Sequence, residues 1–79
     1  MYGFSSQGEG VQFLRNLCYD VGRGTHGMNH LFTAWAPGSK LDIAFVTVSG
    51  ELCFIDEEKR PELGGEFQKI KDALKNYKP

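Results

Sequence analysis

The stretch Leu41 to Ile55, LDIAFVTVSGELCFI, decides the fold. It is the longest run rich in β-branched and aromatic residues, and its Ser-Gly pair at positions 49 and 50 separates two such runs, which is a hairpin signal. A two-residue turn at this pair places Phe45 opposite Phe54 and Val46 opposite Cys53. We therefore predict that an antiparallel hairpin forms the centre of a sheet.

A third strand is predicted before the hairpin. Met28 to Ala36, MNHLFTAWA, has the composition of a strand and ends at a Pro-Gly turn. An even-numbered loop at that turn sets Ala36 opposite Leu41 and Phe32 opposite Phe45, and a three-stranded meander follows. One face then carries Met28, His30, Phe32, Ala34, Leu41, Ile43, Phe45, Leu52 and Phe54, and the other carries Leu31, Thr33, Trp35, Ala44, Val46, Val48, Cys53 and Ile55.

A helix is predicted on the amino-terminal side of the meander. Ser6 to Glu9 has the form of a capping box, in which the serine side chain and the glutamate each satisfy one backbone amide. Gly8 and Gly10 are expected to weaken the first turn by something near 1 kcal/mol each. The glycine-rich stretch 20–27, DVGRGTHG, is predicted to end the helix as a loop. The predicted apolar face of this helix carries Val11, Leu14, Leu17, Cys18 and Val21.

A second helix is predicted after the hairpin. Pro61 suits a first helical turn, although the two glycines at 64 and 65 move the expected start towards Glu66. Its apolar stripe consists of Leu63, Phe67, Ile70, Leu74 and Tyr77, spaced by four, three, four and three residues. The sequence therefore predicts an α+β fold with two layers, in the order helix, three-stranded antiparallel β-meander, helix, forming a single small domain over residues 1–79.

The overall charge removes two classes of partner. Nine basic and ten acidic residues leave a formal charge of −1, which is too little for a domain that grips nucleic acid through its phosphates and too little for a DNA mimic. The amino-terminal residues do not resemble a signal peptide, and no apolar run approaches the roughly 18 residues that span a bilayer. We expect a cytoplasmic protein without a membrane partner, for which nucleic acid is an unlikely ligand.

No motif predicts a metal, a cofactor or catalysis. His26 and His30 are four residues apart, with Cys18 and Cys53 as conceivable further zinc ligands, but structural zinc sites hold their ligands in close pairs that this chain lacks. Both cysteines fall on predicted buried faces, whereas a reactive thiolate needs a polar and partly open setting. We therefore expect no metal, no cofactor and no enzymatic activity.

The order of helix, three strands and helix resembles the topology of the double-stranded-RNA-binding domain. That resemblance implies a basic cluster at the start of the second helix, because such domains hold phosphates there. The corresponding stretch 61–66 of this chain, PELGGE, is acidic and rich in glycine. A domain of this type that binds RNA is therefore an alternative that the charge distribution opposes.

Both predicted faces of the meander are apolar, whereas an antiparallel sheet with one solvated face alternates between apolar and polar residues. Either one helix covers each face, or both helices cover one face and the loop partly covers the face of smaller residues. Alternatively, both helices cover the face with Phe32 and leave the other for a partner. This last account predicts a non-enzymatic protein-binding module that docks onto a partner protein or a second copy of itself. Small phage-encoded inhibitors of bacterial defence complexes, such as anti-CRISPR proteins, work in this way. The predicted partner-binding residues are Leu31, Trp35, Val46, Val48 and Arg23, with Trp35 as the principal anchor.

Overall fold

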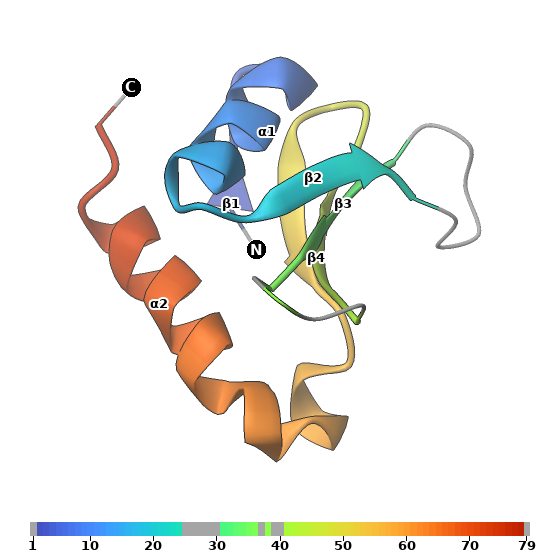
Figure 1. The fold of residues 1–79 in the computed structure, drawn as a ribbon. Helices are drawn as coiled ribbons and strands as arrows, with labels where there is room; N and C mark the ends of the chain where they lie inside the picture. The colour runs from blue at the N-terminus through green and yellow to red at the C-terminus, as the bar shows by residue number, and fades with distance from the viewer. Residues whose placement is uncertain (1, 25–30, 37, 39–40, 79) are drawn as a thin grey trace.

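The computed structural model describes residues 2–24, 31–36, 38 and 41–78. These residues form five strands, two α-helices and two short 3-10 helices (Figure 1). The strands form one antiparallel sheet with the order β1-β5-β4-β3-β2. In chain order the elements are β1 (Tyr2–Gly3), α1 (Gln7–Asn16), β2 (Asp20–Arg23), β3 (Phe32–Trp35), β4 (Asp42–Val46), β5 (Glu51–Phe54), η1 (Glu57–Lys59), η2 (Pro61–Leu63) and α2 (Gly64–Lys75).

The predicted α+β class and the order of helix, meander and helix are confirmed, but the sheet has five strands and not three. The stretch that the glycines marked as a loop contains β2, in which Val21 lies opposite Ala34 and Gly22 lies opposite Thr33. At the other edge Tyr2 lies opposite Leu52. A two-residue strand has no periodicity, and a strand with glycine at its centre loses part of its β-propensity, so neither edge strand has a strong sequence signal.

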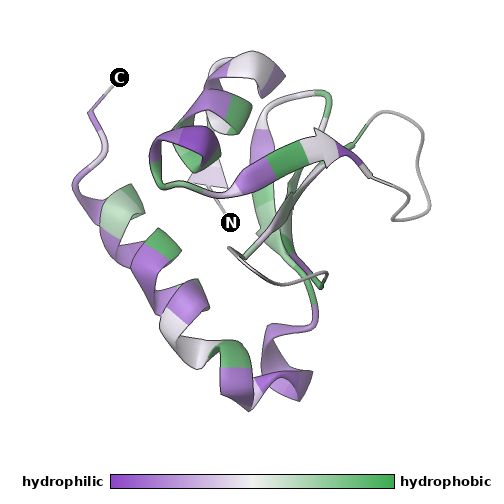
Figure 2. Cartoon of the chain, viewed as in Figure 1, coloured by the Kyte–Doolittle hydropathy of each residue, from purple (hydrophilic) through white to green (hydrophobic). Residues whose placement is uncertain are grey.

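Both helices pack on the same face of the sheet (Figure 1). A Cβ atom at Gly10 of α1 would lie 2.9 Å from Val46 Cγ1, and the ring of Phe67 in α2 makes an edge contact with Phe54 of β5. Figure 2 shows the hydrophilic bands along both helices and the η1–η2 connector, with apolar bands along the strands. The core between helices and sheet consists of Phe4, Val11, Phe13, Leu14, Tyr19, Ala34, Ala36, Ile43, Ala44, Val46, Leu52, Phe67 and Ile70.

The ends of α1 explain its length. The Ser6 side chain accepts a hydrogen bond from the Glu9 backbone N–H at 3.2 Å, so the predicted N-cap is confirmed. At the other end, the Cys18 N–H donates to the Arg15 carbonyl and the Tyr19 N–H donates to the Leu14 carbonyl, which is the Schellman pattern. This pattern requires a left-handed residue after the helix, and Cys18 takes that conformation with φ 68°.

Two tyrosine hydroxyls hold α2 against the rest of the molecule. Tyr19 donates to a Glu66 carboxylate oxygen at 2.6 Å, and Tyr77 donates to the carboxylate of Glu9. Burial and this hydrogen bond raise the pKa of Tyr19, while the bond to Glu9 raises the pKa of Tyr77 to about 12. The predicted apolar stripe of α2 is also confirmed, since all five of its side chains lie in or against the core.

The central hairpin forms as predicted but with a different turn. Thr47 and Glu51 close a three-residue loop: the Thr47 N–H donates to the Glu51 carbonyl, and the Gly50 N–H donates to the Thr47 carbonyl. Gly50 has φ 93°, which is the left-handed position of a three-residue hairpin. Phe45 therefore lies opposite Cys53 and not opposite Phe54, so the predicted register was wrong by one residue.

A bulge shifts the register on the other side of β4. Trp35 lies opposite Asp42, as the predicted turn implies, but Ala34 lies opposite Ala44, so Ile43 is an extra residue in β4. The side chains of a bulged residue and its successor turn towards the same face, and both Ile43 and Ala44 are fully buried in the core. As a result, Val46 faces the helices and Phe45 faces away from them.

Candidate functional site

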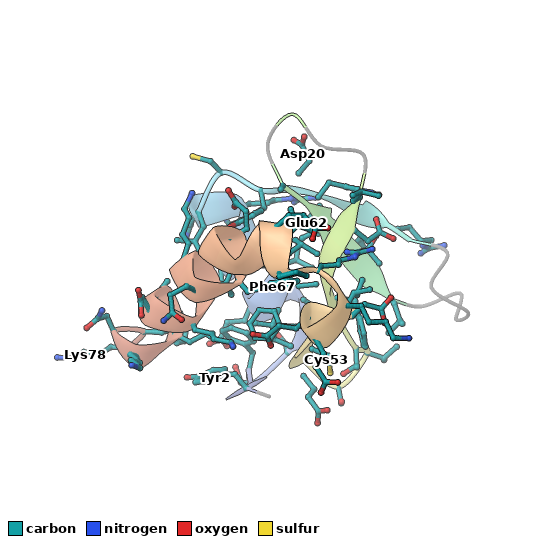
Figure 3. All side chains as sticks on the ribbon, turned by 90° about the horizontal axis from the view of Figure 1, so that it is seen from below. Tyr2, Asp20, Cys53, Glu62, Phe67 and Lys78 are labelled. Atoms are coloured by element: carbon teal, nitrogen blue, oxygen red, sulfur yellow. The ribbon has the colours of Figure 1, made fainter. Side chains whose placement is uncertain are left out.

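The face of the sheet opposite the helices, which we call the helix-free face, is the candidate site. Register places Thr33 and Trp35 of β3, Phe45 of β4 and Cys53 of β5 on this face. Trp35, Phe45 and Cys53 are half-buried. In Figure 3, Asp20 on β2 and Cys53 on β5 lie towards opposite edges of the sheet, and Phe67 lies near the centre of the molecule. The helix-free face thus presents an aromatic centre that spans the middle strands.

Trp35 lies between two carboxylates. Asp20 of β2 and Asp42 of β4 are both directly opposite Trp35 in the register. The indole lies against the backbone of β2, because a Cβ atom at Gly22 would be only 3.3 Å from its Cζ3 atom. Glycine at this position allows the ring to approach the strand closely. The arrangement combines an aromatic surface with two acidic groups on the same side of the sheet.

The rim of the helix-free face is acidic. Asp20, Asp42 and Glu51 occupy register positions on this face, and no described residue at those positions is basic. At Asp42, the Arg60 guanidinium donates a hydrogen bond to the backbone carbonyl. An apolar centre with a carboxylate rim complements a partner surface with lysine or arginine around an apolar patch.

One end of the helix-free face is closed by the chain that leaves β2. A Cβ atom at Gly24 would lie 2.1 Å from Thr33 Oγ1, so the backbone at Gly24 covers the Thr33 side chain. Thr33 is fully buried, and its hydroxyl has no hydrogen-bond partner among the residues that the structure describes. Leu31 beside it is also buried, with 4% of its surface exposed. The accessible part of the face is therefore centred on Trp35 and not on Thr33.

The cysteines do not form a nucleophilic site among the described residues. Burial and the neighbouring Glu51 carboxylate raise the pKa of the Cys53 thiol, which favours the protonated form at neutral pH. The predicted burial of both cysteines is wrong for Cys18, which is exposed beyond the end of α1. In the part of the chain that the structure describes, no three His, Cys, Asp or Glu side chains are placed to hold a metal ion. His26 and His30 lie outside the described residues.

The predicted partner-binding residues do not all share the helix-free face. Trp35 lies on it, and Leu31 has the same register phase but is buried. Val46 is fully buried beneath the helices, and Val48 lies in the hairpin turn with 62% of its surface exposed, so their predicted placement beside Trp35 is wrong. Arg23 is exposed on the edge strand β2, opposite Phe32 and on the helix side of the sheet.

Sequence reasoning missed Phe45 and the three carboxylates of the rim. The signal that places Phe45 correctly is Gly50, because glycine at the last loop position is typical of a three-residue hairpin loop with a left-handed residue. Nothing in the composition of β4 marks the bulge at Ile43. Asp42 and Asp20 become recognisable as a pair only when β2 is known to be a strand beside β3.

Elsewhere, a pocket is lined by Phe54, Asp56 and the η1 residues Glu57, Glu58 and Lys59. Glu57 forms an ion pair there with Lys71 of α2, and Lys71 also lies over the Phe54 ring. These contacts join the connector to α2 and assign the pocket a structural role.

No known protein family, curated protein or solved structure matches this chain in sequence or in fold. Within the described ranges, neither helix has the length and apolar character needed to cross a lipid bilayer. The physical features of the helix-free face therefore carry the functional argument.

Proposed function

We propose that this chain is a non-enzymatic protein-binding module that docks through the helix-free face onto a partner protein with a basic surface. The observation that carries the proposal is the placement of Trp35 between Asp20 and Asp42, on the side of the sheet away from both helices. Tryptophan is enriched among the residues that dominate protein interfaces, and its ring attracts lysine and arginine side chains.

Charge complementarity favours a different protein over a second copy. In a face-to-face pair of identical chains, the carboxylates at Asp20, Asp42 and Glu51 of one copy would approach those of the other. Like charges brought together at an interface are unfavourable. A partner that supplies arginine or lysine beside Trp35 gains both an ion pair and a cation–π contact. A homodimer through this face is therefore the weaker alternative.

The acidic rim also supports the narrower class of function. Protein complexes that handle nucleic acid carry basic surfaces for phosphate groups. A small acidic-rimmed module that covers such a surface acts as a stoichiometric inhibitor, as phage-encoded inhibitors of bacterial defence complexes do. The same rim opposes direct binding of this chain to double-stranded RNA, because carboxylates repel phosphates.

The test begins with photo-crosslinking from position 45, which lies opposite Thr33 on the same face as Trp35, to identify the partner. Reconstitution with the purified partner follows. Trp35 is the chain's single tryptophan, so a shift of its fluorescence reports contact at this face directly. We expect one chain per partner site and weaker binding at higher salt.

Matched variants separate the face from general charge effects. Asp20→Asn with Asp42→Asn removes two charges beside Trp35, whereas Glu58→Gln with Glu62→Gln removes two charges from the exposed connector. We expect the first pair to weaken binding at least tenfold and the second to leave it within twofold. Equal effects of the two pairs, or unchanged Trp35 fluorescence in the complex, would refute the proposed face.

A further inference from the structure

The strand β2 forms one edge of the sheet and offers backbone groups to a further strand. The described residues place no strand beside β2 on the side away from β3. The Gly24 N–H donates to the Leu31 carbonyl at 3.2 Å, and this bond sets which residues of β2 turn their backbone groups towards β3. This orientation alternates along an antiparallel pair. The backbone N–H and C=O groups of Asp20 and Gly22 therefore point towards β3, while those of Val21 and Arg23 point away from it.

The contact of Arg15 independently supports this assignment. Its Nη2 atom, reaching from the end of α1, donates to the Val21 carbonyl oxygen at 3.4 Å. A side chain on α1 reaches that oxygen only if the carbonyl points away from β3. The outward edge of β2 thus presents the backbone N–H and C=O of Arg23 and the backbone N–H of Val21. The Val21 carbonyl also points outward, and it accepts the long and exposed hydrogen bond from Arg15.

The charges along this edge differ between the two faces of the sheet. Arg23 lies on the helix side of β2, and Arg15 approaches the same side from α1. On the opposite side, β2 carries Gly22, which has no side chain, and the exposed Asp20. An added strand therefore meets two guanidinium groups on one face, and the Trp35 ring beside Gly22 on the other.

We infer that β2 binds an extended acidic segment of another protein as a sixth, antiparallel strand. Strand addition at an exposed edge derives affinity from main-chain hydrogen bonds and specificity from alternate side chains. In this geometry the segment's residues opposite Val21 and Arg23 exchange backbone hydrogen bonds with them and direct their side chains to the helix side. Glutamate or aspartate at those positions pairs with Arg15 and Arg23, and small residues at the intervening positions lie beside Gly22.

A second copy of this chain does not fit the same edge. Symmetric antiparallel pairing of two β2 strands that uses Val21 and Arg23 sets Gly22 opposite Gly22 and places Arg23 of one copy beside Val21 of the other. Each such Arg23 then approaches Arg15, which already contacts the Val21 carbonyl. Two pairs of like charges result, so the edge favours an acidic segment of a different chain. This inference concerns another surface and does not depend on docking through the helix-free face.

The probe that tests it is a capped peptide with four Thr-Glu repeats, titrated into the ¹⁵N-labelled protein and followed by NMR. We expect saturable shifts of the Val21 and Arg23 amides and at least tenfold slower hydrogen exchange of the Arg23 amide. The amide of Val48, in the exposed hairpin turn, is the internal reference and stays unchanged. A peptide with four Thr-Lys repeats is expected not to bind.

N-methylation separates strand addition from simple charge attraction. Methyl groups on all glutamate amides block the hydrogen bonds to β2, whereas methyl groups on all threonine amides leave them intact at the same charge and mass. We expect the first peptide to lose binding at least tenfold relative to the second. Arg23→Gln is expected to weaken the unmethylated peptide at least fivefold, and Lys75→Gln, on the exposed end of α2, is the matched control.

Several results would overturn the inference. They are equal binding of the two methylated peptides, binding of the lysine peptide, and no change in the exchange of the Arg23 amide at millimolar peptide. A dimeric mass in solution with the Arg23 amide already protected would assign the edge to a second copy instead. Each of these outcomes leaves the Trp35 fluorescence test of the helix-free face unaffected.

Discussion

The two glycines in the first turns of α1 are predicted to respond in opposite ways to alanine. In a helix, alanine is favoured over glycine by up to about 1 kcal/mol. At Gly8 the nearest atom to a new Cβ is Ser6 Oγ at 4.0 Å, so the space is open. Gly8→Ala is therefore expected to stabilise the protein by roughly 0.5 to 1 kcal/mol, the lower value reflecting its position in the first turn.

At Gly10 the packing of the helix on the sheet decides the outcome. A Cβ atom there would lie 2.9 Å from Val46 Cγ1 and 3.0 Å from Phe4 Cδ2. Neither side chain has space to move, because Val46 is fully buried and the Phe4 ring contacts Tyr2, Phe13 and Tyr77. Overpacking of this kind costs typically about 1 to 3 kcal/mol. After subtraction of about 1 kcal/mol for the gain in helix propensity, Gly10→Ala is expected to destabilise the protein by up to about 2 kcal/mol.

Urea and thermal unfolding measure both changes. In a chain of this size about 1 kcal/mol moves the melting temperature by roughly 4 to 8 °C, so the two variants are expected to differ by several degrees, with similar urea m-values. The double variant Gly10→Ala with Val46→Ala supplies the control, because the smaller residue 46 admits the new methyl group. We therefore expect the double variant to be more stable than the sum of the two single changes predicts, by a coupling free energy of at least about 0.5 kcal/mol. Equal stability of Gly8→Ala and Gly10→Ala would refute the close packing of α1 on β4.

Two further predictions concern the ends of the helices. Cys18→Gly is expected to stabilise the protein by about 1 kcal/mol in urea unfolding, since Cys18 has φ 68° and only glycine takes this conformation without a steric penalty; a loss of stability would contradict the Schellman geometry. The hydrogen bond to Glu9 raises the pKa of Tyr77 from 10.0 to about 12. The stability that this hydrogen bond contributes to the fold is therefore fully present below pH 10 and is lost as the pH rises towards 12. Tyr77→Phe is therefore expected to lower stability at pH 7 and to flatten the fall in stability between pH 10 and 12, and an unchanged alkaline profile would contradict the bond.

The sequence was sufficient to predict the elements with strong periodicity. The stripe of α2 from Phe67 to Tyr77 and the N-cap at Ser6 follow from helical spacing and capping chemistry, and both are present. The alternation of β3 and β5 was also correct, since Phe32 and Phe54 face the helices while Trp35 and Cys53 face away from them. These elements depend on local patterns that tertiary contacts did not alter.

The face of β4 could not be predicted because two single-residue shifts lie on either side of it. The bulge at Ile43 shifts β4 against β3, and the loop that ends at Gly50 shifts β5 against β4. A shift of one residue turns a whole strand over. The two shifts cancel between β3 and β5, so the outer strands of the meander kept their predicted faces while Phe45 and Val46 exchanged places.

This exchange determines what the helix-free face presents. The predicted register placed Val46 and Val48 on the same face as Trp35, which suggested a hydrophobic surface for any partner or a second copy. With the observed register Val46 fills the core and Phe45 takes its place on this face. Asp42 keeps its predicted position opposite Trp35, and Asp20 joins it from an edge strand that the sequence did not reveal. The exchange of Val46 for Phe45 and the addition of the Asp20 carboxylate favour a partner with a basic surface over a self-complementary apolar one. A bulge of one residue therefore has a larger effect on the proposed function than on the fold.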